Sequence, residues 1–279
     1  MILLRSTDEC PYGCDCTGDT RYIKCINRTD IPEFSSRLEI SKLDITDSFI
    51  PILDTSGFQY FAFLTTLRII NCNISFFRVV DTWDLTYLIR LDISSNKLTD
   101  ILSETVSNCP DLLDLNLTNN PLVDLKPWRT VLVSDSLMYL TMRNCQLTKF
   151  SKLSFSKLPN LVYLDLNDNK LTSLGGVPIL NIVPRLVMLG LGNNNNWNCR
   201  NLNLQLQNCS SIQPSMRCLN EDGNVEIRKC KSKAEIKVTY TGIKRRYFAN
   251  KWYDAFENLR DFYTKKYVRD ATIYRKKGY

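Results

Sequence analysis

The chain has 279 residues, 44% of them hydrophobic, which is enough apolar material for a continuous core, and it contains no histidine. Catalysis by Ser-His-Asp, Cys-His or histidine-metal chemistry is therefore excluded, and neither a P-loop nor a glycine-rich dinucleotide motif occurs. The sequence predicts a protein that is not an enzyme and that uses no cofactor or metal. No run approaches the ~20 apolar residues of a membrane span.

The cysteines indicate the compartment. The 11 residues form a front, a middle and a rear group: Cys10, Cys14, Cys16 and Cys25; Cys72, Cys109 and Cys145; Cys199, Cys209, Cys218 and Cys230. Two groups of four predict two disulfide-bonded caps in an oxidising compartment. Zinc is the alternative for the front group, but C-x-C without a second C-x-x-C is not a usual zinc spacing.

An extracellular location requires a signal peptide, and the start of the chain does not resemble one. Residues 1–4 supply few apolar residues before Arg5, whereas a signal peptide needs a core of about 7–15. We therefore expect that a signal peptide is absent from this chain because its start is trimmed or mispredicted.

Residues 158–174, LPNLVYLDLNDNKLTSL, contain the pattern L-x-x-L-x-L-x-x-N-x-L. Seven copies of this eleven-position template begin at residues 40, 64, 88, 112, 137, 161 and 186, a nearly fixed interval that chance would not maintain. Leu164 and Leu166 would point inward from a short strand. Asn169 would turn the chain and bond backbone groups left unpaired by the bend. One copy cannot bury its own leucines, so the copies must stack.

Strands at the third to seventh template positions would align as a parallel sheet on a concave face. Early copies place charged and polar residues there, and later copies place apolar and aromatic ones, which is typical of a protein-binding surface. The predicted ligand-binding residues are Arg90, Leu113, Asp114, Met138, Tyr139, Val162, Tyr163, Asp165, Val187 and Met188. Two alternatives are coverage of these side chains by neighbouring strands and coverage by the C-terminal segment.

Two cysteines occupy the Asn position of the template. Cys72 and Cys145 lie three copies apart, about 15 Å at ~4.8 Å per strand, which is too far for a disulfide. We expect both to be free, buried thiols and Cys109 to pack in the core.

Four N-x-S/T sequons make Asn27, Asn73, Asn116 and Asn208 candidate glycosylation sites. A glycan at Asn116 would lie on the concave face.

The C-terminal segment differs in charge from the rest of the chain. Residues 228–279 contain 16 of the 36 Lys and Arg and 5 of the 29 acidic residues, a net charge of +11, whereas the whole chain carries +7. Aromatic residues recur every three or four positions and predict a helix over about residues 245–269. The helix could pack on the rear cap, bind a protein, or bind an anionic surface through Lys244, Arg245, Arg246, Lys265 and Lys266. Nucleic acid is not expected, because disulfides indicate the wrong compartment.

Residues 10–34 contain C-P-x-x-C-x-C, a strand ending in Cys25 and an Ile31-Pro32 step. This pattern resembles the N-terminal cap of extracellular leucine-rich repeat proteins, which include Toll-type ectodomains, Slit domains, small leucine-rich proteoglycans and insect immune repeat proteins. The sequence alone allows three pairings of the front cysteines. The resemblance implies the disulfides Cys10–Cys16 and Cys14–Cys25.

The rear of the array carries a weaker likeness to the same family. Trp197 and Cys199 resemble the N-P-W-x-C entry to its C-terminal cap, although Asn196 replaces the proline and Asn201 stands where a second cysteine often occurs. Cys199–Cys218 with Cys209–Cys230 is the expected pairing.

The resulting fold class is α/β: a leucine-rich repeat solenoid, a curved parallel β-sheet horseshoe, with disulfide caps and a C-terminal helix. The expected divisions are an N-terminal cap at 1–36, seven repeats at 37–197, a C-terminal cap at 198–232 and a basic aromatic tail at 233–279. The resemblance implies a secreted or cell-surface module that binds a protein or glycan ligand on the concave face, in innate immunity or cell adhesion. The alternative is a structural, matrix or membrane-associated assembly protein tethered through its basic C-terminal helix.

Overall fold

The computed structural model divides the chain into two compact units, Met1–Ser232 and Lys233–Tyr279. The structure describes only residues of the first unit. These are residues 10–16, 21–33, 40–58, 61–78, 85–101, 104–107, 109–123, 130–173, 179–186, 188–194, 197–198, 200, 215–219 and 225–229. The predicted C-terminal helix, with its basic residues, lies outside them.

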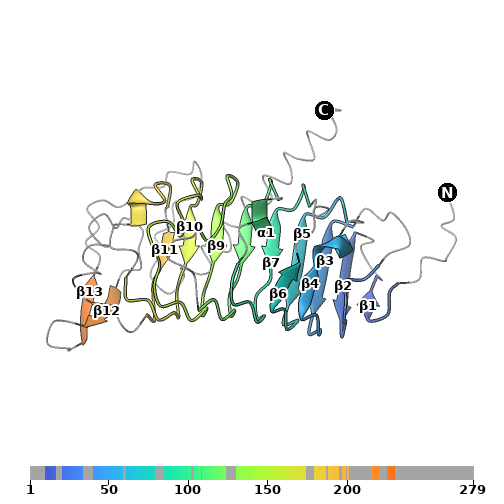
Figure 1. The fold of residues 1–279 in the computed structure, drawn as a ribbon, viewed down its shortest axis with the longest axis horizontal. Coiled ribbons are helices and arrows are strands. Elements are labelled where there is room, and N and C mark those ends of the chain that lie inside the picture. Colours follow the sequence, from blue (N-terminus) through green and yellow to red (C-terminus); the bar gives the residue numbers. More distant parts are fainter. Residues whose placement is uncertain are drawn as a thin grey trace, which may run out of the picture. The chain divides into compact units, whose positions relative to one another are not determined.

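A nine-stranded sheet runs through the first unit (Figure 1). Its strands, in spatial order, are β1 (Cys14–Asp15), β2 (Tyr22–Ile26), β3 (Lys42–Thr46), β5 (Thr66–Ile70), β7 (Arg90–Asp92), β8 (Asp114–Asn116), β9 (Tyr139–Thr141), β10 (Tyr163–Asp165) and β11 (Met188–Gly190). Only β1 and β2 pair antiparallel, and every later neighbour is parallel and in the same template register. The predicted repeat solenoid is confirmed.

The strands are shorter than expected in the rear copies. β3 and β5 cover the third to seventh template positions, but the strands from β7 onward cover only the third to fifth. The fourth and sixth positions nevertheless stay inside along the whole array. Leu164 and Leu166 are both fully buried, as are their equivalents Leu140 and Met142 one copy earlier. This continuous apolar column is the main source of stability, because burial contributes about 25 cal/mol per Å² of apolar surface.

The template asparagines connect consecutive copies. Asn169 donates from Nδ2 to the carbonyl oxygen of Met142 in the preceding copy at 2.8 Å and to those of Leu166 and Asn167 in its own turn. Its Oδ1 accepts from the backbone N–H groups of Cys145 and Leu147. The predicted use of this amide on unpaired backbone groups is confirmed.

Asn96, Asn120 and Asn194 repeat the same arrangement. At Cys145 the thiol takes over the donor role, because its Sγ lies 3.2 Å from the carbonyl oxygen of Leu117 in the preceding copy. Cysteine therefore replaces only part of the asparagine bonding at this position.

The eighth template position adopts a left-handed backbone in all seven copies. The residues are Asp47, Asn71, Ser95, Asn119, Asn144, Asp168 and Asn193, with φ between 49° and 59°. Asn and Asp tolerate this conformation better than other non-glycine residues. Their side chains also bond from copy to copy, as where Asn144 donates to Asn119 at 2.9 Å. The leucine template does not mark this position, although the Asn, Asp and Ser residues that occupy it are a signal in the sequence.

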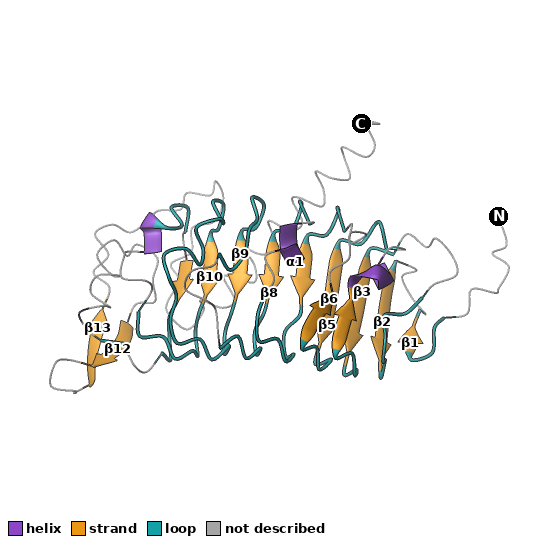
Figure 2. Ribbon diagram, in the orientation of Figure 1, coloured by secondary structure: helices purple, strands orange, loops and turns teal. Residues whose placement is uncertain are grey.

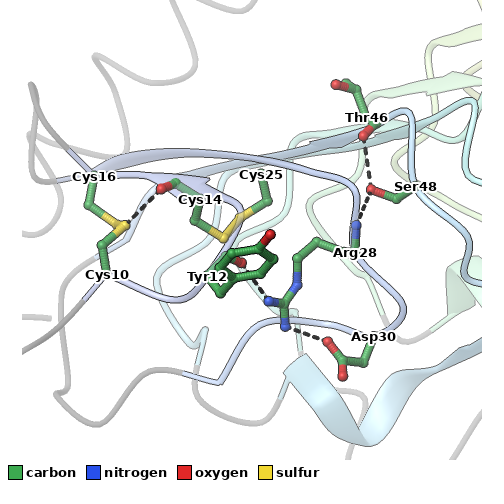
Figure 3. Close-up of a disulfide and its surroundings, with 9 residues drawn as sticks. All are labelled: Cys10, Tyr12, Cys14, Cys16, Cys25, Arg28, Asp30, Thr46 and Ser48. Carbon is green, nitrogen blue, oxygen red and sulfur yellow. Dashed lines mark hydrogen bonds and ion pairs between the residues drawn. A yellow bond between two sulfur atoms is a disulfide. The ribbon is translucent and has the colours of Figure 1, made fainter.

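The front cap contains the two predicted disulfides, Cys10–Cys16 and Cys14–Cys25 (Figure 3). The second joins β1 to β2, and β2 continues the repeat sheet by pairing in parallel with β3. Arg28 then links the cap to the first copy, since its backbone N–H donates to Ser48 Oγ at 3.0 Å. The cap thus covers the open end of the apolar column, as a terminal repeat must.

The return path of the first two copies forms a second, two-stranded parallel sheet. It consists of β4 (Ile52–Asp54) and β6 (Phe76–Arg78), two of the strands drawn in orange in Figure 2, and their central residues Leu53 and Phe77 belong to the core. The described helical segments are short: η1 (Thr55–Phe58), α1 (Glu104–Ser107) and η2 (Ile179–Asn181). Turns and loops make most of the rest of the return path within the described ranges.

Little of the rear cap is described. Strands β12 (Ser215–Leu219) and β13 (Val225–Lys229) pair antiparallel. Trp197, which carries the likeness to the C-terminal cap, is fully buried. Cys199, Cys209 and Cys230 lie outside the described residues, so the rear pairing stays a prediction.

Candidate functional site

The outer side of the nine-stranded sheet, which we name the sheet face, is the predicted concave face. Its third-position column runs through Lys42, Thr66, Arg90, Asp114, Tyr139, Tyr163 and Met188 in one register. Its fifth-position column runs through Asp44, Arg68, Asp92, Asn116, Thr141, Asp165 and Gly190 in the same register. Parallel pairing places the members of each column about 4.8 Å apart.

The cap extends the sheet face by one strand. Tyr22 is the register partner of Lys42, and Lys24 is that of Asp44. None of the predicted ligand-binding residues lies in the cap. The signal was present in the alternation of exposed Tyr22 and Lys24 with buried Ile23 and Cys25.

The buried carboxylate on the front part of the sheet face is bonded by two neighbouring strands. Asp44 Oδ2 accepts from the hydroxyl of Tyr22 and from Nη1 of Arg68, both at 2.9 Å. Burial and then this bond to Asp44 raise the pKa of Tyr22. The exposed end of the Arg68–Asp44 ion pair limits its contribution to stability, but the pair neutralises the charge of Asp44.

In the middle of the sheet face, charged and amide side chains of neighbouring copies also contact each other. Arg90 Nε lies 3.1 Å from Asp114 Oδ2, an ion pair by distance but without the alignment of a hydrogen bond. In the next column, Asn116 donates from Nδ2 to Asp92 Oδ2 at 3.1 Å. The predicted ligand-binding residues Arg90 and Asp114 therefore contact each other, and Asp114 is buried.

The rear part of the sheet face is aromatic and contains one buried carboxylate. The rings of Tyr139 and Tyr163 are tilted with centroids 6.5 Å apart. Tyr163 donates its hydroxyl to Asp165 Oδ2 at 3.2 Å, and the backbone N–H of Asn167 donates to Oδ1 at 2.9 Å. Burial raises the pKa of Asp165, and these bonds offset that effect only in part.

Gly190 makes this arrangement possible. A Cβ atom at this position would lie 2.6 Å from Nδ2 of Asn167 and 2.8 Å from Oδ1 of Asp165. Without a side chain at Gly190, Asn167 extends over β11 and accepts from the backbone N–H of Gly192 at 2.5 Å. The last strand is therefore tied to the previous copy through side chains as well as through the sheet.

The expectation that the aromatic patch is exposed is wrong for its tyrosines. Tyr139 is 2% exposed, Tyr163 is 6% exposed and Leu113 is 8% exposed. A contributing cause is that aromatic side chains spaced at a strand interval lie against one another, as the Tyr139–Tyr163 pair does. This contact fits coverage by neighbouring strands, whereas the other alternative, coverage by the C-terminal segment, lies outside the described residues.

The remaining predicted ligand-binding residues fall into three groups. Met138, Val162 and Met188 are half-buried and still reach the surface. Asp165 is 5% exposed and Arg90 is half-buried. Val187 lies outside the described residues. The accessible apolar part of the sheet face is therefore smaller than predicted, and it is made by aliphatic and Met side chains.

The three cysteines of the middle group lie in the core. Cys72 and Cys145 are free and buried, as predicted, and Cys109 is buried. Burial raises the pKa of Cys72 to about 11 and that of Cys145 to about 12. Within the described ranges, no three His, Cys, Asp or Glu side chains gather to hold a metal ion.

The four sequons differ in setting. Asn27 is exposed and Asn73 is half-buried, both with left-handed backbones. Asn116 is half-buried on the sheet face, and Asn208 lies outside the described residues.

No described helix has the length and apolar character needed to cross a bilayer.

Comparison with known proteins supports a likeness to leucine-rich repeat proteins. A family model for leucine-rich repeats matches residues 135–178. Bovine osteomodulin (Bos taurus) is 35% identical over 112 residues, which cover 39% of this chain and 25% of that protein. Trophoblast glycoprotein of Macaca fascicularis is 25% identical over 127 residues, covering 43% of this chain and 24% of that protein. The matched part is about a quarter of the length of these relatives.

Solved structures give the same fold. Human 5T4, a trophoblast glycoprotein, superposes with a TM-score of 0.57 at 24% identity and covers 77% of this chain and 81% of that one. The mouse RP105/MD-1 complex contains a chain with a TM-score of 0.55 at 16% identity, covering 72% of this chain and 39% of that one.

The chain has the leucine-rich repeat fold, part of it matches the leucine-rich repeat family model, and it is similar to osteomodulin and trophoblast glycoprotein. These relatives are non-catalytic repeat proteins, in agreement with the prediction that the chain is not an enzyme.

Proposed function

We propose that the chain is an extracellular recognition module that binds a protein or a glycan on its sheet face. The observation that carries the proposal is the sheet face itself, a nine-stranded surface in constant register whose charged and amide side chains are held by contacts between copies. A surface fixed in this way loses little conformational entropy on binding. The two front disulfides support an oxidising compartment.

The accessible rear residues are the best candidates for the contact. Met138, Val162 and Met188 are half-buried apolar side chains beside the tyrosine pair. Such residues resemble the apolar centre of protein interfaces more than the self-neutralised front part does. Innate immunity and cell adhesion are the biological settings that this proposal favours.

The experiment uses the secreted chain as a probe against an array of extracellular domains and an array of glycans. Met138→Glu and Val162→Glu should abolish any specific signal, because each places a charge in the apolar contact. Lys152→Glu is the matched control, since Lys152 is exposed on the return path. All three variants must retain the wild-type unfolding temperature. Binding that survives both sheet-face variants, or that is lost in the control, contradicts the proposal.

The alternative, tethering through the basic tail, is distinguished by a second arm. Residues 1–232 form a compact unit that can be compared with the full chain. Adhesion through the tail should fade between low and ~1 M salt and should vanish when residues 233–279 are removed. Recognition through the sheet face should survive both treatments.

A further inference from the structure

The first two repeat copies expose three apolar side chains in the segments that follow their sheet strands. Phe49 is 58% exposed, Phe76 is 55% exposed and Ile52 is 45% exposed. Ile52 and Phe76 are direct register partners in β4 and β6. We name these three residues the Phe49 patch. Exposed apolar groups that cluster in this way normally have an occupant.

The Phe49 patch is confined to the front of the array. The residue equivalent to Phe49 in the third copy is Lys97, and the residue equivalent to Ile52 and Phe76 there is Asp100. The apolar character is therefore not a requirement of the template. It is a local property of the two copies next to the cap.

Two sequons flank the Phe49 patch. On one side, the backbone N–H of Phe49 donates to the carbonyl oxygen of Arg28 at 2.7 Å, and Asn27 directly precedes Arg28. On the other side, the backbone N–H of Ile50 donates to the carbonyl oxygen of Cys72 at 2.8 Å, and Asn73 directly follows Cys72. Asn27, Phe49 and Asn73 thus lie on three consecutive strand-and-turn units.

Asn73 is also tied to the strand pair that carries the patch. Ser75, the hydroxyl residue of its sequon, donates its backbone N–H to the carbonyl oxygen of Pro51 at 2.9 Å. Phe76 follows Ser75 and pairs with Ile52. A sugar on Asn73 would therefore begin three residues before Phe76 in the chain.

The amide groups of the described sequons differ in availability. Among the described residues, the side-chain amides of Asn27 and Asn73 make no hydrogen bond, and both residues have φ above 50° at a turn. Asn116, in contrast, uses both ends of its amide. Its Nδ2 donates to Asp92 at 3.1 Å, and its Oδ1 accepts from the backbone N–H of Thr118 at 3.0 Å.

We propose that Asn27 and Asn73 carry N-linked glycans whose first sugars pack on the Phe49 patch, and that Asn116 is unmodified. The sugar donor is an oligosaccharide linked to a lipid diphosphate, and a secretory-pathway transferase supplies the catalysis. Nδ2 of each asparagine forms a bond to the anomeric carbon of the first N-acetylglucosamine and loses one proton. The bond from that carbon to the diphosphate oxygen breaks, and the lipid diphosphate leaves with the electron pair. This inference rests on the proposed extracellular location.

Packing on the Phe49 patch has a physical basis. One face of N-acetylglucosamine presents C–H groups, which pack against the faces of aromatic rings and remove apolar surface from water. N-linked glycans also solubilise the surface that they cover. The sugars would close the return-path side of the front copies to protein partners and leave the sheet face open.

The first experiment tests the sites. The full chain, preceded by a secretion signal, is produced in eukaryotic cells and mapped by mass spectrometry before and after enzymatic glycan removal. Asn27→Gln and Asn73→Gln should each lose one glycan, and Asn116→Gln should lose none. Ser75→Ala should lose the Asn73 glycan, whereas the matched variant Ser75→Thr should keep it. Secreted, disulfide-bonded chain without glycans at Asn27 and Asn73, or with one at Asn116, would overturn the inference but not the proposed function.

The second experiment tests the packing by hydroxyl-radical footprinting. Oxidation of Phe49 and Phe76 should rise several-fold when the glycans are removed completely, and it should stay low when they are trimmed to the first sugar. Phe63, which is 43% exposed elsewhere, serves as the internal control and should not change. Unchanged oxidation of Phe49 and Phe76 would overturn the packing. Self-association of the glycosylated chain would also overturn the packing if Phe49→Ser abolished it. A second copy of the chain would then occupy the Phe49 patch. A chain that cannot be secreted with intact cap disulfides would overturn the proposed function as well.

Discussion

Asn169 Oδ1 accepts a hydrogen bond of 2.9 Å from the backbone N–H of Cys145, one copy earlier in the array. Cys145 occupies the same template position as Asn169, and its own Sγ lies 3.2 Å from the carbonyl oxygen of Leu117, one copy further back. The two residues show how copies are joined: each turn residue bonds the backbone of its predecessor. Asparagine both donates and accepts there, whereas cysteine only donates.

This relationship predicts a ranking of substitutions at residue 169. Asn169→Ala leaves buried backbone groups of two copies unpaired, and at about 1–3 kcal/mol for each such group the free energy of unfolding should fall by about 3 kcal/mol or more. Asn169→Cys should cost clearly less, because a thiol can keep donor bonds as Cys145 does. Denaturant unfolding monitored by circular dichroism measures both. An equal loss in the two variants would contradict the bonding role.

Gly190→Ala should destabilise the rear of the array. The new Cβ would meet Asn167 Nδ2 and Asp165 Oδ1 at less than van der Waals distance, and overpacking of this kind costs about 1–3 kcal/mol. Asn167→Ala removes the closer of the two contacts. The double variant should therefore be more stable than the sum of the single effects predicts. Strict additivity in the unfolding free energies would show that the two side chains do not compete for this space.

Asp165→Asn should change how stability depends on pH. Burial raises the pKa of Asp165 from its ordinary value of 3.8, so the folded chain holds this proton more tightly than the unfolded chain. The stability that this residue contributes is present below pH 3.8 and is lost as the pH rises through the raised value. The unfolding temperature of Asp165→Asn should therefore improve relative to wild type from acid to neutral pH. Asp111→Asn, at an exposed position, is the control and should show no such trend.

Cys72 and Cys145 should resist alkylation in the folded protein. With pKa values of about 11 and 12, on the order of a thousandth or less of either thiol is ionised at pH 8. Iodoacetamide followed by peptide mapping should label neither residue in buffer and both in denaturant. Rapid labelling without denaturant would show that the turns open on their own.

The disulfide Cys14–Cys25 should stabilise the front cap more than Cys10–Cys16 does. It joins β1 to β2 and closes the longer loop, and Cys25 is fully buried against the first copy. Replacing Cys14 and Cys25 by serine should cost about 2–5 kcal/mol. It should also raise hydrogen exchange in β3, the strand that pairs with β2. A larger effect from replacing the exposed Cys10 and its partner would contradict this assignment.

Periodicity was sufficient for the architecture. The spacing of inward leucines predicted the solenoid, the Asn turns and the burial of Cys72 and Cys145, because each of these depends on a residue and its equivalents in neighbouring copies. The cap pairing followed from its resemblance to known caps. These features repeat, or are locally encoded, and the sequence by itself determined them.

Only the tertiary structure decided which side chains a ligand can reach. Tyr139 and Tyr163 occupy outward positions in the template yet are buried. Exposure at such a position depends on the volume and rotamer of neighbours in adjacent copies, which lie 24 or 25 residues away in the chain. The same holds for the hydrogen bonds that occupy Asn116 and for the backbone bonds that join Phe49 and Ile50 to the flanks of two sequons. Template position sets the direction of a side chain, but packing between copies sets its accessibility.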